Sequence, residues 1–532
     1  MRPLLLALAV LISALPAAAQ YDVSIAADIV PGSESSYPGG YEASQSSGLV
    51  LYDGRLFFTA SNGESWRQLW AFDATTGQAS LAADLLPGSP PCPAPPDPPP
   101  SPQPPDCNAP SHLAVYGGRL FFNGIGDQGG VELWAFDAAS GEASLVADIS
   151  TSGNGNSNPF SLTVYAGRLF FSAEAGQHGD GEHGRELWAY DATANEATLV
   201  ADVRPGLGSS NPSSFAVYGG RLFFNANDGT HGRELWAYDA TTDQTSLVAD
   251  ILPGSGDSWP ISLTVYDGRL FFGATGSENG RELRAYDAST DEASLVADIF
   301  PGAGDGGPIG LTVYDDRLFF LGYSGEYGAE LWAYDAATNT AQLVVDANPG
   351  SGSSYPAYMT EYDGRLFFVA ASDLWVYDAA TNEASPIDFY SGSDCPDLWP
   401  EACFYPAYLS VYDDRLFFRG YTDEYGAELW AVSRPPVANE TSAAPQSVHL
   451  RTPHPNPAQD RATVTFEIAE AGPVRVEVLD VLGRSVALLA DGPVAAGEHT
   501  LTWEADALPS GLYLVRLTAG DAVQTQRLTL AR

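Results

Sequence analysis

The chain has 532 residues and a formal net charge of −43, and all 24 of its basic residues are arginines. A surface this acidic repels nucleic acids and anionic lipids, which excludes both as partners. The acidic residues are spread along the chain rather than clustered at calcium-binding spacing. They therefore favour solubility in a salty medium, with divalent-cation binding as the alternative.

Residues 1–20 have the features of a secretory signal. Arg2 precedes an apolar run, Leu4–Leu15, and three alanines follow at Ala17–Ala19. The run is too short to span a membrane and no other segment comes closer, so the sequence predicts an exported protein without a membrane span. We expect it to be secreted, either released or attached to the outer cell surface.

A repeat fills residues 21–432. The motif Arg-Leu-Phe-Phe begins at eight positions, and the step between copies is 48 residues in the most regular part. The copies begin at Arg55, Arg119, Arg168, Arg221, Arg269, Arg317, Arg365 and Arg415. A fixed period of this length is typical of repeat architectures.

Each copy predicts four strands. In the fourth copy, runs rich in Val, Leu, Phe, Tyr and Trp span Ser214–Tyr218, Arg221–Ala226, Glu234–Tyr238 and Thr245–Ile251. Two glycines between the first two runs are typical of a tight hairpin, and an Asp-led turn joins the last two. The strands are apolar on both faces, so each sheet must be covered on both sides, which stacking around a ring achieves. We therefore predict an all-β fold, an eight-bladed β-propeller with four-stranded antiparallel blades.

The two ends of the repeat region predict how this ring closes. The eighth copy ends at Glu428–Val432 and has no fourth strand, whereas Val23–Ile29 has the pattern of a strand but belongs to no copy. If this N-terminal strand completes the last blade, no sheet edge stays open.

The four cysteines fit export to an oxidising environment. Cys92 and Cys107 flank one Pro-rich insertion, and Cys395 and Cys403 flank another. Three pairings are possible, and we favour Cys92–Cys107 with Cys395–Cys403 because each bond would close one local loop. Metal binding is the alternative, although no Cys-x-x-Cys spacing occurs.

Residues 433–448 have the composition of a linker, and residues 449–532 lack the repeat. Short alternating strands there predict a small Ig-like β-sandwich. Pro455-Asn456-Pro457, Val478–Asp480 with Gly483-Arg484, and Gly511–Leu517 resemble the type A C-terminal sorting domain of the type IX secretion system. The resemblance covers the whole segment. It implies the type IX machinery as a partner, passage across an outer membrane, and removal of this domain on export.

The repeats carry a second resemblance. Gly232–Trp236, Asp239–Thr241, Val248–Ile251 and Pro253–Ser255 are similar to bacterial proteins with ELWxxDGT repeats, although alanine stands where that family has glycine after the Asp. The resemblance covers residues 21–432. It implies an extracellular propeller and no assigned reaction.

Arginine and aspartate recur at the ends of neighbouring antiparallel strands. Arg221 opens the second strand of its copy and Asp239 closes the third, as Arg269 and Asp287 do in the next copy. We expect structural ion pairs repeated around one rim, with a ligand role as the alternative.

No catalytic constellation is visible in the sequence. There is no Gly-x-Ser-x-Gly motif, and paired carboxylates are too frequent to identify a glycosidase. We expect neither a cofactor nor a metal. His178, His183 and His231 lie in loops between second and third strands, and the string from His178 to His183 is the alternative metal site.

Binding residues are expected on one rim only. Loops after the first and third strands share a uniform rim, whereas loops after the second and fourth strands share the rim that carries the irregularity. On the second rim lie Pro87–Pro110, the loop from His178 to His183, Asp257-Ser258-Trp259, and Trp399 between the last two cysteines. Insertions confined to one face mark a binding face, and exposed aromatic side chains suit contact with sugar or protein. The alternative is that these loops simply tolerate changes in length.

Three functions fit this sequence. The absence of a catalytic constellation favours a binding or adhesion module for extracellular glycan or protein over an enzyme. An extracellular enzyme acting on polysaccharide and a structural surface-layer component remain as alternatives.

Overall fold

The structure is a computed structural model. It describes residues 21–32, 35–39, 48–62, 67–85, 110–125, 130–150, 155–175, 183–387, 406–422, 424–434, 448–451, 453–456, 458, 460–468, 471–480, 484–505, 508, 511–519 and 522–530. Every helix or strand assigned in these residues is a β-strand, so no helix there has the length and hydrophobicity to cross a membrane. The expected signal segment, the four cysteines and most of the expected linker lie outside the described residues.

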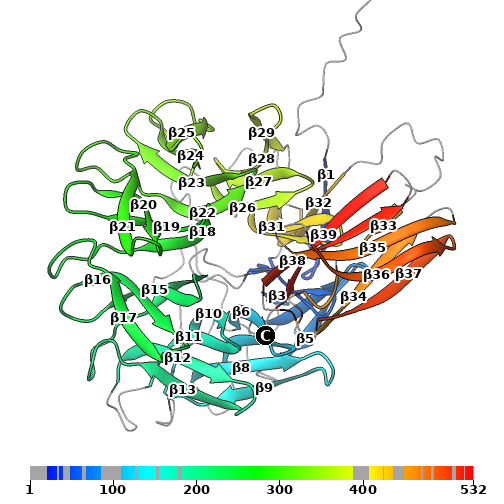
Figure 1. Ribbon diagram of the computed structural model, residues 1–532, viewed down its shortest axis with the longest axis horizontal. Coiled ribbons are helices and arrows are strands. Elements are labelled where there is room, and N and C mark those ends of the chain that lie inside the picture. Colours follow the sequence, from blue (N-terminus) through cyan, green and yellow to red (C-terminus); the bar gives the residue numbers. More distant parts are fainter. Residues whose placement is uncertain are drawn as a thin grey trace, which may run out of the picture. The chain divides into compact units, whose positions relative to one another are not determined.

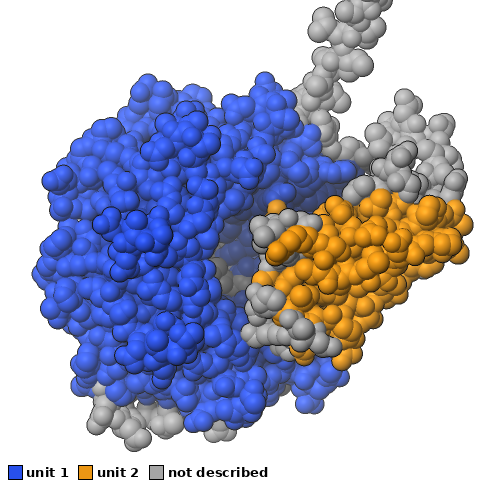
Figure 2. All heavy atoms as spheres, in the orientation of Figure 1, with its two compact units in different colours: residues 1–435 blue, residues 436–532 orange. Residues whose placement is uncertain are grey.

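Contacts divide the chain into two compact units, Met1–Pro435 (unit 1) and Pro436–Arg532 (unit 2), which Figure 2 shows in separate colours. The described residues of unit 1 form eight four-stranded antiparallel sheets, which are numbered here in chain order.

Sheet 1 contains β2 (Val50–Tyr52), β3 (Arg55–Ala60), β4 (Gln68–Asp73) and β5 (Gln78–Ala83), and sheet 2 contains β6 (Ser111–Tyr116), β7 (Arg119–Ile125), β8 (Val131–Asp137) and β9 (Glu142–Ala147). Sheet 3 contains β10 (Phe160–Tyr165), β11 (Arg168–Glu174), β12 (Arg185–Asp191) and β13 (Glu196–Ala201), and sheet 4 contains β14 (Ser213–Tyr218), β15 (Arg221–Asn227), β16 (Arg233–Asp239) and β17 (Gln244–Ala249). Sheet 5 contains β18 (Ile261–Tyr266), β19 (Arg269–Thr275), β20 (Arg281–Asp287) and β21 (Glu292–Ala297), and sheet 6 contains β22 (Ile309–Tyr314), β23 (Arg317–Ser324), β24 (Gly328–Asp335) and β25 (Thr340–Val345). Sheet 7 contains β26 (Ala357–Tyr362), β27 (Arg365–Ala370), β28 (Asp373–Asp378) and β29 (Glu383–Ile387), and sheet 8 contains β30 (Ala407–Tyr412), β31 (Arg415–Thr422), β32 (Gly426–Ser433) and β1 (Asp22–Ala27).

The tight turns follow from their residues. Between β14 and β15, Gly219 and Gly220 have φ values of 56° and 78°, and Asp267 and Gly268 take 45° and 71° at the equivalent turn of sheet 5. Two consecutive left-handed residues match the twist of the flanking strands, which is why glycine and aspartate occupy these positions. The chain then reverses without a loop that could carry a side-chain site.

The core of unit 1 lies between successive sheets. Along β15, Leu222, Phe223 and Phe224 are all fully buried. Phe223 packs against sheet 5, whereas Leu222 and Phe224 pack against sheet 3. Alternate residues of one strand thus serve opposite neighbours, because side chains alternate between the two faces of a sheet. Figure 1 shows the sheets following one another around a circle, from blue through cyan and green to yellow.

The first and last sheets also share a core. Phe417 and Leu429 of sheet 8 pack with Leu56 and Phe58 of sheet 1. The N-terminal segment completes sheet 8, because β1 pairs antiparallel with β32. The outer edge of β32 is therefore paired, as the sequence led us to expect.

Tyr21 gives this closure a second component. In sheets 3 to 7, a tyrosine on the third strand accepts a hydrogen bond from the motif arginine of the preceding sheet; Tyr286, for example, accepts from Arg221 at 2.6 Å. In sheet 8 that position holds Val432, which cannot accept the bond. The Tyr21 hydroxyl takes its place and accepts from Arg365 at 2.9 Å. The N-terminal segment thus supplies both a strand and a missing side chain.

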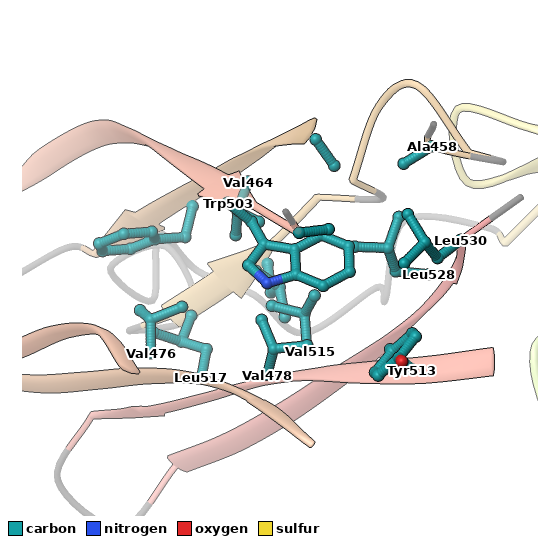
Figure 3. Packing of buried hydrophobic residues seen from close by; sticks show 14 of the residues in the cluster. Ala458, Val464, Val476, Val478, Trp503, Tyr513, Val515, Leu517, Leu528 and Leu530 are labelled. Carbon is teal, nitrogen blue, oxygen red and sulfur yellow. The ribbon is translucent and has the colours of Figure 1, made fainter. Parts of the chain in front are cut away.

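Unit 2 has two sheets around one core. The three-stranded sheet has the order β33 (Val448–Leu450), β34 (Arg461–Ile468) and β37 (Gly497–Glu504). The four-stranded sheet has the order β36 (Ser485–Val494), β35 (Gly472–Asp480), β38 (Gly511–Ala519) and β39 (Ala522–Leu530). Figure 3 shows Trp503 of the first sheet surrounded by Val464 and by Val476, Val515 and Leu528 of the second.

Candidate binding rim

The loops after the second and fourth strands meet on one edge of unit 1, which we call the connection rim. The backbone N–H of Arg233, where β16 begins, donates to Oδ1 of Asp257 at 2.6 Å. The carbonyl of Arg233 in turn accepts from the N–H groups of Ser258 and Trp259 at 3.0 and 3.2 Å. The connection between sheets 4 and 5 is therefore hydrogen-bonded to the start of β16, the third strand of sheet 4.

A buried glutamate fixes the connection that follows each of sheets 2 to 6 and the one that follows β1 of sheet 8. The Glu234 side chain is fully buried, and its carboxylate accepts from the N–H of Ile251 at 2.7 Å and from the N–H and hydroxyl of Ser258 at 3.1 and 2.7 Å. The same glutamate–serine bonds join Glu132 to Ser157, Glu186 to Ser210, Glu330 to Ser354 and Glu428 to Ser36. In sheet 5, Glu282 bonds the N–H groups of Ile299 and Gly306.

Burial changes the acidity of these glutamates. Loss of hydration raises the pKa of Glu234, Glu282 and Glu428 to about 7, although the hydrogen bonds they accept act in the opposite direction. Asp250 adds to the increase at Glu234 by like-charge repulsion.

Sheet 1 carries a neutral side chain in the same place. Its Gln68 accepts from the N–H of Leu85 at 2.9 Å and donates from Nε2 to Asp84 Oδ1 at 2.8 Å. A protonated glutamate carries an O–H group, which can donate a hydrogen bond as the side-chain amide of Gln68 does. These glutamates are occupied by the connections they hold, so their arrangement is structural rather than that of a catalytic pair.

The residue after the serine is displayed on the connection rim. It has a positive φ, near 50° at both Trp259 and Tyr355, and a proline follows it. The Trp259 side chain is 42% exposed and Tyr355 is 68% exposed. The same position holds Tyr37, Asn158, Asn211 and Gly307 in other connections. A bulky aromatic residue in the left-handed region is uncommon, and it persists here because the serine and proline on either side are fixed.

Arg233 supports the indole of Trp259. Its guanidinium carbon lies 4.4 Å from the centre of the ring, a cation–π arrangement. The guanidinium also donates to the carbonyl of Asn211 and to Oδ1 of Asn225, both at 2.7 Å. The arginine is therefore held by the connection before β14 and by β15, and it fixes the ring above it. The side chain of Asp257 accepts from the Arg233 backbone.

The two described histidines on this rim are each paired with one carboxylate. His231 Nδ1 lies 2.7 Å from Asp228, which raises the pKa of the imidazole, and His183 Nδ1 lies 2.8 Å from Asp202. Among the described residues, no group of three or more His, Asp or Glu side chains is placed to hold a metal ion. His178 and Trp399, which were also expected on this rim, lie outside the described residues.

The ion pairs predicted between Arg221 and Asp239 and between Arg269 and Asp287 are not formed. The Arg221 guanidinium lies over its own strand's Phe223 and reaches the next sheet, whereas Asp239 accepts two bonds from Thr241 within its turn. Arg269 likewise donates to Tyr334, and Asp287 accepts two bonds from Ser289. The prediction was wrong because each group has a nearer partner. In sheet 7 a direct pair does form, between Arg365 and Asp378 at 2.9 Å.

Sequence reasoning placed Asp257, Ser258 and Trp259 on this rim but missed Glu234 and Arg233. A signal for Glu234 was present, because a glutamate at this position precedes a serine by 24 residues in three of the copies. A polar pair that recurs at a fixed distance in several repeats indicates a bond that those repeats need.

Comparison with known families identifies unit 2. Residues 453–531 match the secretion system C-terminal sorting domain. No curated protein matches the chain.

Solved structures resemble the chain only distantly. The extracellular domain of BT4673 from B. thetaiotaomicron is 11% identical, with 90% of this chain and 74% of that one covered and a TM-score of 0.37. A prolyl endopeptidase is 10% identical, with 83% and 56% covered and a TM-score of 0.44, so the chain spans little more than half of that enzyme. PorZ, a surface component of the type IX secretion system of Porphyromonas gingivalis, is 13% identical, with 91% and 75% covered and a TM-score of 0.25.

The sorting domain settles where the protein works. Type IX sorting domains mark proteins that are secreted and attached to the cell surface. The chain therefore carries a type IX C-terminal sorting domain and is a secreted protein of the cell surface.

Proposed function

We propose that this protein is a cell-surface binding module for extracellular glycan or protein, exported by the type IX secretion system. In this proposal unit 1 is an eight-bladed β-propeller spanning residues 21–432. Residues 433–448 link it to an Ig-like sorting domain, residues 449–532. Support comes from the eight four-stranded sheets of unit 1, the cores between successive sheets, and the sorting-domain match.

One observation carries the binding role. Trp259 is a large exposed aromatic side chain held in place by Arg233 below and by the bonds of Ser258 to Glu234. An aromatic ring that is both exposed and immobilised loses little conformational entropy on binding, which favours recognition. The buried glutamates are bonded to the connections, so they support a binding surface rather than a reaction.

The test uses the mature chain, by which we mean residues 21–532, the chain that lacks the expected signal segment and keeps the sorting domain. Its binding would be measured on a glycan array and by capture of proteins from the cell surface, alongside a screen for polysaccharide degradation. Binding without turnover is the expected result. Release of sugar fragments would show that the protein is an enzyme, and absence of any ligand in both assays would favour a structural surface-layer component.

A further inference from the structure

The repeats vary most visibly at the position that the connection rim displays. Around it, the proline and the buried glutamate recur, and a serine precedes it in every one of these connections except that of Gly307, where Gly306 takes its place. The displayed residue itself is Asn158, Asn211, Trp259, Gly307 or Tyr355 in successive connections. The backbone geometry hardly changes along this series, since φ is 48° at Asn211, 50° at Trp259, 54° at Gly307 and 51° at Tyr355. A constant frame that presents different side chains is suited to reading different parts of one ligand.

The frame is also bonded in the same way each time. The N–H groups of Trp259, Gly307 and Tyr355 donate to the carbonyls of Arg233, Arg281 and Ala329, at 3.2, 2.9 and 3.1 Å. Each acceptor directly precedes the buried glutamate on the third strand of its sheet. These three residues therefore occupy equivalent places in consecutive connections. The exposed rings of Trp259 and Tyr355 belong to the connections on either side of Gly307. Because Gly307 has no side chain, it places no bulk between the two rings.

Arg233 joins the connections that display Asn211 and Trp259. Its guanidinium lies under the Trp259 ring and donates to the backbone carbonyl of Asn211, so it contacts both connections. Tyr355 has no such arginine beneath it, because Ala329 occupies the position of Arg233, and the ring is correspondingly more exposed. Flat aromatic surfaces match the apolar faces of sugar rings, and the amide of Asn211, at the equivalent position of the preceding connection, suits their hydroxyl groups.

The negative charge of the protein favours neutral over anionic sugars as ligands. The protein carries a formal net charge of −43. Arg233 is 8% exposed as a whole residue and its guanidinium donates to protein oxygens, so it offers little to an anion. A polymer of uronic acids or sulfated sugars would be repelled by this surface.

We propose that Asn211, Trp259, Gly307 and Tyr355 form one extended site for a neutral polysaccharide, with Trp259 and Tyr355 as two stacking platforms and Gly307 as the open track between them. The inference rests on the proposed binding function and specifies its ligand. A chain of neutral sugars would cross three consecutive connections on the rim, which a single monosaccharide could not do.

Affinity electrophoresis of the mature chain tests the proposal. The probes are a neutral xylan, a neutral mixed-linkage β-glucan, anionic polygalacturonate and cationic chitosan. We expect retardation by at least one neutral probe and none by polygalacturonate. Trp259→Ala and Tyr355→Ala should each weaken binding to that probe about tenfold, a loss of about 1.4 kcal/mol, and Trp259→Phe should retain part of it.

The control is Leu295→Ala, which removes a side chain of similar exposure, 39%, from β21 and away from the rim. It should bind as the wild type does. Thermal melting of each variant separates lost binding from lost folding, and the graded response of Trp259→Phe keeps the test valid if Trp259→Ala melts early.

The outcomes distinguish this inference from the proposed function. Neutral-probe binding that survives both alanine variants overturns the site but leaves a glycan-binding protein. Binding confined to polygalacturonate or chitosan overturns the ligand class. Capture of a protein without any glycan binding overturns the inference while the binding module stands, and absence of every ligand overturns both.

Discussion

Removal of Tyr21 should open the ring of sheets at its closure. Tyr21 is 8% exposed, and its ring packs edge-on against Phe367 with 5.0 Å between the ring centres. Its hydroxyl accepts a hydrogen bond from Arg365 and donates one to Asp363. Replacing a buried aromatic side chain with alanine costs about 3 kcal/mol. Tyr21→Phe keeps the aromatic side-chain ring and loses only the hydrogen bonds of the hydroxyl. Because Arg365 retains Asp378, this change should cost about 1 kcal/mol.

A rescue experiment tests whether Tyr21 stabilises the closure by replacing the tyrosine that is missing at position 432. Val432 occupies the position where other repeats place their tyrosine, so Val432→Tyr should restore a partner for Arg365 in the Tyr21→Ala background. In the wild type the same change overfills an occupied space and should cost about 2 kcal/mol. The double variant should therefore be more stable than the sum of the two single changes predicts.

Urea denaturation of the mature chain, followed by tryptophan fluorescence, measures the stability of the wild type, Tyr21→Ala, Tyr21→Phe, Val432→Tyr and the double variant. Tyr286→Phe serves as the matched control, because it removes an equivalent bond, to Arg221 at 2.6 Å, from a repeat whose tyrosine lies on its own third strand. Simple additivity of Tyr21→Ala and Val432→Tyr would refute the view that Tyr21 replaces the missing tyrosine. A melting curve of Tyr21→Ala that matches the wild type would refute its role in closure.

Three further outcomes are expected. The pKa of Glu234, Glu282 and Glu428 is raised to about 7 from an ordinary 4.5. Their stabilisation of unit 1 is therefore complete below about pH 4.5 and is lost as pH rises through about 7. Glu234→Gln should flatten the fall in melting temperature between about pH 5 and pH 8. An unchanged slope would show that other groups cause this fall. Mass spectrometry of the surface protein should find no peptides from residues 449–532, and recovery of a chain ending at Arg532 would contradict removal of the sorting domain. Peptide mapping without reduction should link Cys92 to Cys107 and Cys395 to Cys403, whereas free thiols or crossed links would contradict the local pairing.

Unit 1 was largely predictable from the pattern of its sequence. Leu222, Phe223 and Phe224 are apolar in succession, and a strand that is apolar on both faces must be buried on both, as the full burial of all three demonstrates. The glycine pair at Gly219 and Gly220 predicted a left-handed turn, and both φ values are positive. These features depend on near neighbours in the chain, so local sequence was sufficient to predict them.

The side chains between sheets were less predictable. Arg221 and Asp239 lie at adjacent strand ends, which suggested an ion pair, yet the arginine bonds Tyr286 of the next sheet. That partner is 65 residues away, and only the stacking of sheet 5 on sheet 4 brings it near. Tyr21 is a stronger case, because its partner Arg365 is 344 residues away in sequence.

The sequence by itself determined the strands, their turns, the repeat and the sorting segment, because these follow from periodicity, backbone preference and motif order. The tertiary structure alone decided which polar groups meet. Glu234 is a strand residue in the sequence, and it becomes the acceptor of three bonds because the connection folds back over it. Trp259 becomes a binding candidate for the same reason, since Arg233 and Ser258 fix a ring that the sequence could place only in a loop. Hydrogen bonds and stacking act over a few ångströms, so they depend on packing that no local pattern encodes.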